Sequence, residues 1–235
     1  WVSKILSLDK TLTIRAQEKG TAVIFPQRST LIEINNKGNL TLDGVYVDAT
    51  NAPDAAGNTL IRTTRLPMQR NYRLAIKNST FENLDINHSY HFFDAGNRSF
   101  ADYIEVQDSQ FKHITGDLFR LNKETDDLGI YNVEYLTIEN SNVSDLQGAI
   151  AKVYRGGTDE STFGPHVVMN NNIFNEVGKG KRNKSAASLI LHGTQVNKMT
   201  TNEFINSAPI IFELTVGEPK TWVTGNVFEG TPEPV

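Results

Sequence analysis

Short stretches of alternating apolar and polar residues recur along this chain at nearly regular intervals. Each stretch reads apolar–x–apolar, continues with polar residues and reaches a phenylalanine or valine, which is the period-two pattern of short strands. A weaker copy, LTLDGVYVDA, occupies 40–49. The clearest copies are LAIKNSTFENL (74–84), IEVQDSQFKHI (104–114), LTIENSNVSDL (136–146), VVMNNNIFNEV (167–177), NKMTTNEFINS (197–207) and WVTGNVFEG (222–230).

The spacing of these copies indicates a solenoid. Most steps between the aligned aromatic or valine positions are about 30 residues, within the range typical of solenoid repeats. A second apolar run follows each copy, as in TLIRT, YHFFDA, DLFRL, AIAKVY, SLILHG and PIIFEL. Two or three short strands per repeat, without helical periodicity, favour a β-solenoid over a propeller, whose blades need four strands. We expect the aligned residues to form an interior column: Val47, Phe81, Phe111, Val143, Phe174, Phe204 and Phe228.

Polar residues keep a fixed register before this column. Two positions before it stand Ser79, Ser109, Ser141, Asn172, Asn202 and Asn226, and three positions before it stand Asn78, Asp108, Asn140 and Asn171. Successive coils of a parallel β-helix stack about 4.8 Å apart. Asparagines at one corner can therefore form a ladder of amide hydrogen bonds, and asparagine tolerates the left-handed backbone of a sharp corner. Asn and Ser are also general turn formers, but the fixed register favours the ladder.

These patterns predict an all-β fold, a right-handed single-stranded parallel β-helix of about seven coils with extended loops. A chain of 235 residues fits one such domain, 1–235. The repeat is longer than a minimal coil, so some turns must be extended, and such loops are where function concentrates. The predicted loops are 49–59, 122–135, 155–166 and 178–186.

Composition narrows the function classes. The formal net charge of −4 shows no basic footprint for nucleic acid, and no run of about 18 apolar residues predicts a membrane span. The chain has no cysteine, which excludes disulfides and thiolate metal sites. It opens at Trp1 within a strand-like pattern, so we expect a piece of a longer protein.

One loop combines candidate catalytic side chains. In VYRGGTDESTFGPH (153–166), Tyr154 and His166 are candidates for acid or base catalysis, and Arg155 could clamp a carboxylate. That carboxylate would belong to Asp159 or Glu160, or to a uronic acid in a sugar chain. A loop that is paired internally and braces the next coil explains the same residues, and the local spacing leaves both interpretations open.

An acidic cluster is the candidate metal site. Glu124, Asp126 and Asp127 place three carboxylates within four residues, which suits a hard cation such as Ca²⁺. The spacing of an EF-hand loop is absent, and a solvated turn is the favoured interpretation.

A basic stretch is the candidate anion site. GKGKRNKS (178–185) carries Lys181 and Arg182, which could attract a polyanion on a slightly acidic chain, although a solvated loop is favoured. His192 follows an apolar strand and is explained equally well as a satisfied edge residue or as a candidate for contacting substrate. Arg155 is a further candidate for contacting substrate.

Four stretches carry a family resemblance: LNKETDDLGIYNVEYLTIENS (121–141), YRGGTDESTFGP (154–165), GKGKRNKSAASLILHGTQ (178–195) and TVGEP (215–219). Together they resemble the C-terminal half of the alginate lyases of polysaccharide lyase family six, relatives of chondroitinase B. The resemblance extends from about Leu40 to the end of the chain. It implies two parallel β-helix domains in tandem, of the pectin-lyase-like kind, and cleavage of uronic-acid polymers by β-elimination. In that family a Ca²⁺ neutralises the substrate carboxylate, a lysine abstracts the proton and an arginine assists as acid.

The family's catalytic lysine and arginine and its calcium ligands lie in the N-terminal β-helix, and this chain has no counterpart of that block. The resemblance therefore assigns no catalytic residue and no cofactor to this segment, and it places Ca²⁺ in the absent N-terminal catalytic domain. The implied partners are that domain and alginate as the acidic polysaccharide, with a homodimer as a further option and with no nucleic acid or membrane. The implied location is secreted or periplasmic.

Three functions follow as hypotheses. The favoured one is a C-terminal domain that supports stability, domain packing or the substrate cleft without carrying the chemistry. The alternatives are a self-sufficient lyase that uses loop 154–166 and a non-catalytic polysaccharide-binding module. In the favoured case Arg155 pairs with Asp159 or Glu160.

Overall fold

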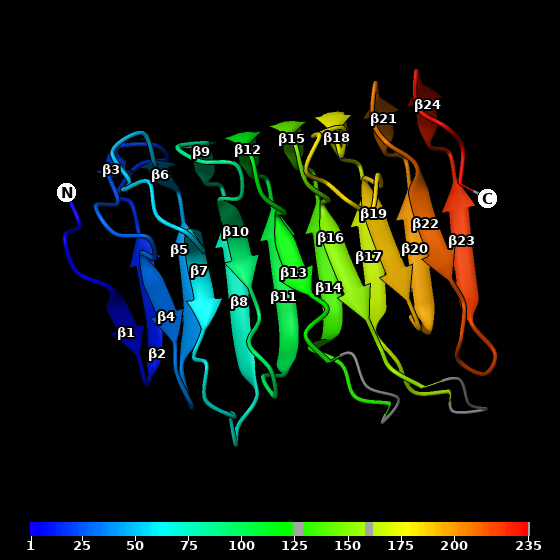
Figure 1. Cartoon of the computed structure of the whole chain (residues 1–235), viewed down its shortest axis with the longest axis horizontal. Helices are drawn as coiled ribbons and strands as arrows, with labels where there is room; N and C mark the ends of the chain where they lie inside the picture. The colour runs from blue at the N-terminus through cyan, green and yellow to red at the C-terminus, as the bar shows by residue number, and fades with distance from the viewer. Residues whose placement is uncertain (125–128, 158–161, 235) are drawn as a thin grey trace.

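The chain forms a stack of β-coils, shown by a computed structural model that describes residues 1–124, 129–157 and 162–234. Figure 1 shows the coils following one another along the long axis from the N-terminus to the C-terminus. Each coil gives one strand to each of three sheets, all strand pairs are parallel, and each sheet has eight strands within the described residues. The parallel β-helix is confirmed. The coil count differs slightly from the expected seven, because a first set of strands precedes the first recognisable copy of the repeat.

Three sheets run the length of the stack, and we call them sheets I, II and III. Sheet I comprises β1 (Leu6–Leu8), β4 (Ile32–Ile34), β7 (Thr59–Thr63), β10 (His91–Asp94), β13 (Phe119–Leu121), β16 (Ala151–Tyr154), β19 (Leu189–His192) and β22 (Ile210–Glu213). Sheet II comprises β2 (Thr11–Arg15), β5 (Asn39–Asp43), β8 (Tyr72–Lys77), β11 (Ala101–Gln107), β14 (Val133–Glu139), β17 (His166–Asn170), β20 (Val196–Thr200) and β23 (Lys220–Thr224). Sheet III comprises β3 (Ala22–Ile24), β6 (Val45–Asp48), β9 (Thr80–Leu84), β12 (Gln110–Ile114), β15 (Asn142–Leu146), β18 (Ile173–Val177), β21 (Glu203–Ile205) and β24 (Val227–Glu229).

The predicted aromatic column lies inside sheet III. Phe81 stacks on Phe111 with ring centroids 5.3 Å apart. Phe204 stacks between Phe174 at 4.9 Å and Phe228 at 5.3 Å. Val143 pairs in register with Phe111 and Phe174, so it divides the column into two stacks. Phe81, Phe111, Phe174 and Phe204 are fully buried, and each ring contributes heavily to the core.

The predicted polar ladder is confirmed at the corner between sheets II and III. The Asn172 amide nitrogen donates to Asn202 Oδ1 at 2.9 Å, and Asn202 donates to Asn226 Oδ1 at 2.9 Å. In the earlier coils serine replaces asparagine, and Ser109 Oγ accepts from the backbone N–H of Ser79 at 3.2 Å. Each preceding residue has the left-handed backbone that such a corner needs: Asn78, Asp108, Asn140, Asn171 and Thr201 have φ between 50° and 55°.

A second left-handed position was missed from the sequence. It lies two residues after Phe81, Phe111, Val143, Phe174 and Phe204, at Asn83, His113, Asp145, Glu176 and Asn206, with φ between 46° and 60°. In a regular strand side chains alternate between the two faces. Here the left-handed residue lets two consecutive side chains face outward before the next residue, such as Leu84 or Ile114, returns to the core.

The four predicted loops connect β6 to β7, β13 to β14, β16 to β17 and β18 to β19. The described residues include no helix that could cross a membrane. Two of these loops, 122–135 and 155–166, include residues that the structure does not describe.

Candidate functional site

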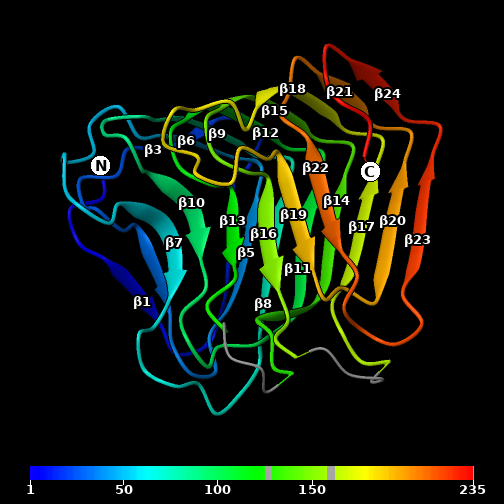
Figure 2. The same cartoon turned by 45° about the vertical axis from the view of Figure 1, so that its right-hand side comes forward.

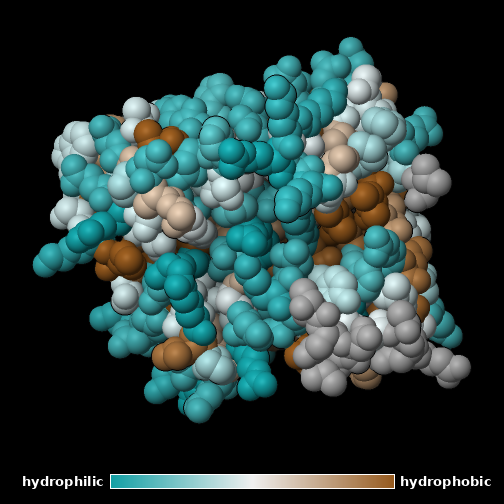
Figure 3. All heavy atoms as spheres, in the orientation of Figure 1, coloured by the Kyte–Doolittle hydropathy of each residue, from teal (hydrophilic) through white to brown (hydrophobic). Residues whose placement is uncertain are grey.

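Charged side chains form a row along the outer face of sheet I. The paired residues are, in order, Glu33, Arg62, Asp94, Arg120 and Lys152, followed by Ile190 and Ile211. The first charges alternate in sign, with Arg62 Nη2 at 2.6 Å from Glu33 Oε2 and Arg120 Nη1 at 3.5 Å from Asp94 Oδ2. The alternation stops where Arg120 and Lys152 meet. Figure 3 shows hydrophilic side chains over most of this face and an apolar patch toward its C-terminal end.

A groove of about 620 Å³ opens at this point. Its floor lies over β10, β13 and β16, and its rim is the segment 181–184. Figure 2 shows the yellow segment after β18 reaching back over the preceding coils toward β10. The side chains of lysine and arginine that line the groove are Arg120, Lys152, Lys181, Arg182 and Lys184, and the carboxylate is that of Asp117.

Asp117 organises the floor of the groove. Its side chain is buried, its Oδ1 accepts a hydrogen bond from the Ala149 amide at 2.9 Å, and Lys152 Nζ lies 2.8 Å from the same oxygen. Arg120 Nε lies 3.8 Å from Oδ2. A buried carboxylate needs such partners, so Asp117 holds both cations in place beneath the opening.

His91 lies beside Asp117 in an order that resembles a serine–histidine–aspartate triad. Its Nε2 is 2.9 Å from Ser89 Oγ, and its Nδ1 is 3.5 Å from Asp117 Oδ2. However, Nδ1 accepts the Asp117 backbone N–H at 2.8 Å, which places the ring proton on Nε2. A nucleophilic serine needs a histidine that accepts its proton. Burial also lowers the pKa of His91 to about 4, so the imidazole is a weak base.

The rim segment is held by its own hydrogen bonds. The Asn183 side chain donates to the carbonyls of Gly178 at 2.7 Å and Ala187 at 2.9 Å. Gly180 donates to the Gln147 carbonyl at 3.0 Å, and a side chain there would come within 2.6 Å of Gln147 Cβ. The segment therefore rests directly on the preceding coil.

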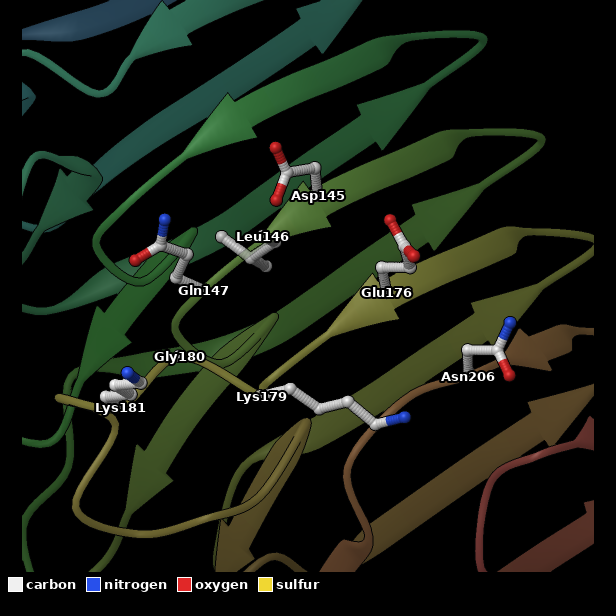
Figure 4. Close-up of a pocket in the computed structure, with 8 residues that line it drawn as sticks. All are labelled: Asp145, Leu146, Gln147, Glu176, Lys179, Gly180, Lys181 and Asn206. Carbon is white, nitrogen blue, oxygen red and sulfur yellow. The ribbon is translucent and has the colours of Figure 1, made fainter.

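A second hollow, of about 560 Å³, lies on the other side of the same segment. Figure 4 shows Asp145, Glu176 and Asn206 on successive coils, with Lys179 and Lys181 on the segment beside them. Because carboxylates and amines share its lining, this hollow does not favour a polyanion. Lys179 thus lies in the same segment as Lys181 without lining the basic groove.

Tyr154, Arg155 and His192 come together at the corner after β16 and β19. The Tyr154 and His192 rings stack at 4.2 Å, and His192 Nδ1 donates to the Arg155 carbonyl at 3.1 Å. The Arg155 side chain is buried, its Nη1 donates to the Gly156 carbonyl at 3.2 Å, and a side chain at Gly129 would come within 3.1 Å of its Nη2. Arg155 thus packs into the corner. Its predicted partners Asp159 and Glu160 lie outside the described residues.

His166 does not join that cluster. It lies on sheet II, where its Nε2 is 3.2 Å from Gln195 Oε1 and its ring meets the edge of Tyr135 at 5.0 Å. Tyr154 and His166 therefore make separate sets of contacts, on sheet I and on sheet II.

The acidic cluster is described only in part. Glu124 is buried and accepts a hydrogen bond from the Arg98 amide, so this carboxylate ties down a neighbouring loop. Asp126 and Asp127 lie outside the described residues. Across 1–124, 129–157 and 162–234, no group of three or more His, Asp or Glu residues could hold a metal ion.

The groove brings together Lys181 and Arg182, which the sequence analysis had identified as candidates, with Arg120 and Lys152, which it had missed. Arg120 and Lys152 occupy equivalent places in the runs DLFRL and AIAKVY. Reading the outward position of each such run in register would have found this pair.

Comparison with known proteins gives a specific match. No protein-family model matches the chain, and no curated protein does. Two solved structures of "PL6 family alginate lyase AlyGC", one of them a point mutant, match with a TM-score of 0.98 and 99% sequence identity. Each match covers 100% of this chain and 32% of the other, so the chain spans about a third of the length of the structures it resembles.

Proposed function

This chain belongs to the PL6 family of alginate lyases as a segment of about a third of its solved relatives' length, and on that premise we propose that it is a non-catalytic β-solenoid domain of an alginate lyase. Its roles would be to support the enzyme and to contact the acidic polymer. The β-elimination itself would take place in another part of the longer chain, which would also hold the Ca²⁺ implied by the family. The proposal includes the secreted or periplasmic location that the family resemblance implies.

The contacts of the candidate residues carry this proposal. Elimination on a uronate needs a carboxylate neutraliser, a base and an acid that converge on one sugar. Arg155 is buried at a corner, and His166 lies on a different sheet from Tyr154. In the groove, Lys152 is ion-paired with Asp117, and an ion-paired ammonium has no lone pair with which to abstract a proton. These residues suit packing and binding better than proton transfer.

A self-sufficient lyase that uses loop 154–166 is the second candidate. The stacked rings of Tyr154 and His192 favour it, because they form a polar corner beside that loop. The buried position of Arg155 counts against it, because a substrate carboxylate would have to reach a side chain that is 3% exposed.

The decisive experiment is to incubate the 235-residue chain with alginate, with and without Ca²⁺, and to follow the ultraviolet absorbance of the unsaturated product. We expect a flat trace from protein whose circular dichroism shows folded β-structure, and restored turnover when the remainder of the enzyme is added. Product formation by the folded chain alone would overturn the proposal, and Tyr154→Phe and Arg155→Ala would then test the second candidate.

A further inference from the structure

We propose that the basic groove on sheet I is a binding site for carboxylated sugar chains. The inference rests on the proposed function for the identity of the polymer.

The charge of the groove is opposite to that of the chain. Its lining carries five lysine and arginine side chains against the single carboxylate of Asp117, although the chain as a whole has a formal net charge of −4. Asp117 is already engaged by Lys152 and by the Ala149 amide. A concentration of one charge sign in a cleft focuses the field and raises the local concentration of oppositely charged ligand.

The like-charged neighbours Arg120 and Lys152 are the second observation. Elsewhere in this row opposite charges pair across coils, as Arg62 does with Glu33. Like charges directly opposite each other on neighbouring strands destabilise a sheet. Their retention in the groove is accounted for if an anion outside the protein bridges them, with Asp117 offsetting the repulsion from below.

The coils pack tightly against each other at the floor of the groove. A side chain at Gly148 would come within 2.4 Å of the Gly116 carbonyl and 2.6 Å of Asp117 Oδ1, and one at Gly116 would collide with Tyr90. Glycine at these corners therefore lets adjacent coils approach closely, which keeps Asp117 and the two cations that it pairs with in fixed places beneath the rim segment.

The spacing of the cations suits a linear polyanion. Arg120 and Lys152 occupy adjacent coils in register, about 4.8 Å apart along the stack. A linear polyanion lying along the axis would therefore meet a cation on each of these two adjacent coils. Arginine binds carboxylates through two parallel hydrogen bonds, and Lys181 and Arg182 would close over the chain from the rim.

The test measures binding of a fluorescently labelled alginate hexasaccharide by anisotropy at low salt, where attraction between exposed charges is strongest. The double substitution Lys181→Ala/Arg182→Ala removes two rim charges and is expected to raise Kd about tenfold. The matched control Lys179→Ala/Lys198→Ala removes the same charge from exposed positions that do not line the groove, and it should change Kd less than about twofold. The carboxyl-reduced hexasaccharide should bind neither protein.

Equal losses in the two double variants would overturn the proposal, as would equal binding of the carboxyl-reduced sugar. A DNA oligonucleotide of equal charge that binds as tightly and with the same dependence on Lys181 and Arg182 would also overturn it.

The Lys152→Met substitution tests the floor of the groove. If the Lys152→Met protein does not fold, the rim variants alone decide the question. The ultraviolet assay on the same mixtures separates the two ideas. Turnover by the chain alone would overturn the proposed function, whereas a failure of the unsubstituted chain to bind the hexasaccharide, without turnover, would overturn only the groove. In the longer enzyme, the rim variant should raise KM for polymer and leave kcat unchanged.

Discussion

The polar ladder and the basic groove lie on different parts of the same coils and differ in how they are built. The ladder repeats one position from coil to coil, with Asn172, Asn202 and Asn226 bonded to one another along the axis. The groove gathers different residues from several coils and adds a rim segment that reaches back across them. Stacking rewards repetition because every coil supplies the hydrogen-bond partner of the next. Recognition of a ligand instead needs side chains that differ from coil to coil.

The first prediction concerns the ladder, where the largest effect on stability is expected. Asn202→Ala removes two donated hydrogen bonds, to Met169 O and Asn226 Oδ1, and two accepted from Asn172. At roughly 1 kcal/mol for each buried bond, the free energy of unfolding should fall by about 4 kcal/mol. Urea unfolding measures it, with the exposed Asn142→Ala as the control expected to change stability by less than about 0.5 kcal/mol. A similar small loss in both variants would show that the ladder does not stabilise the coil corner.

The second prediction concerns His91 in the groove and the pH dependence of the free energy of unfolding. Burial lowers the pKa of His91 from 6.5 to about 4, so the unfolded chain takes up a proton between these values while the folded chain does not. The stability associated with the neutral His91 is therefore fully present above pH 6.5. As the pH falls toward 4, the free energy of unfolding decreases by about 3 kcal/mol in total. Unfolding free energies measured from pH 7 to pH 4 should decline accordingly.

The matched variants for this pH dependence are His91→Asn and His88→Asn. In His91→Asn the new side-chain amide oxygen can still accept the Asp117 backbone N–H in place of Nδ1, so the decline should flatten. His88 is exposed, and its replacement should leave the decline as it is. The lowered pKa values of Asp43 and Asp48 act at more acidic pH and are common to all three proteins. A decline that persists in His91→Asn would assign the pH dependence to other groups.

The contrast between the two regions also explains what the sequence could predict. The residue patterns of the strands, the aromatic column and the ladder each recur in several copies of the repeat, so their fixed register reveals them. This holds even though Val143 interrupts the column and serine replaces asparagine in the early coils. The residues of the groove, in contrast, do not recur from one copy of the repeat to the next. Asp117 and Lys152 become neighbours only through the stacking of coils, and no local pattern joins them to the rim at 181–184.

The loop around Arg155 shows the opposite failure. The density of Arg, Tyr and His side chains in this loop suggested a common site. However, β16 and β17 belong to different sheets, so Tyr154 and His166 lie in separate surroundings. Nearness in sequence is a poor guide to convergence across a coil corner, because the chain changes direction there. The predicted pairing of Arg155 with Asp159 or Glu160 stays a prediction.

The last and smallest effect is expected at the second left-handed position, where repetition is imperfect. Some coils carry asparagine there, as at Asn83 and Asn206, but Glu176 has the same conformation, with φ of 56°. A left-handed backbone costs most residues about 1 kcal/mol, and asparagine adopts it more readily. Glu176→Asn should therefore raise the free energy of unfolding by about 0.5 kcal/mol. The control Glu203→Asn replaces an exposed residue in β21, where asparagine is disfavoured, and should give no gain. If Glu176→Asn instead destabilised the chain as much as the control, side-chain contacts of Glu176 rather than backbone strain would govern that corner.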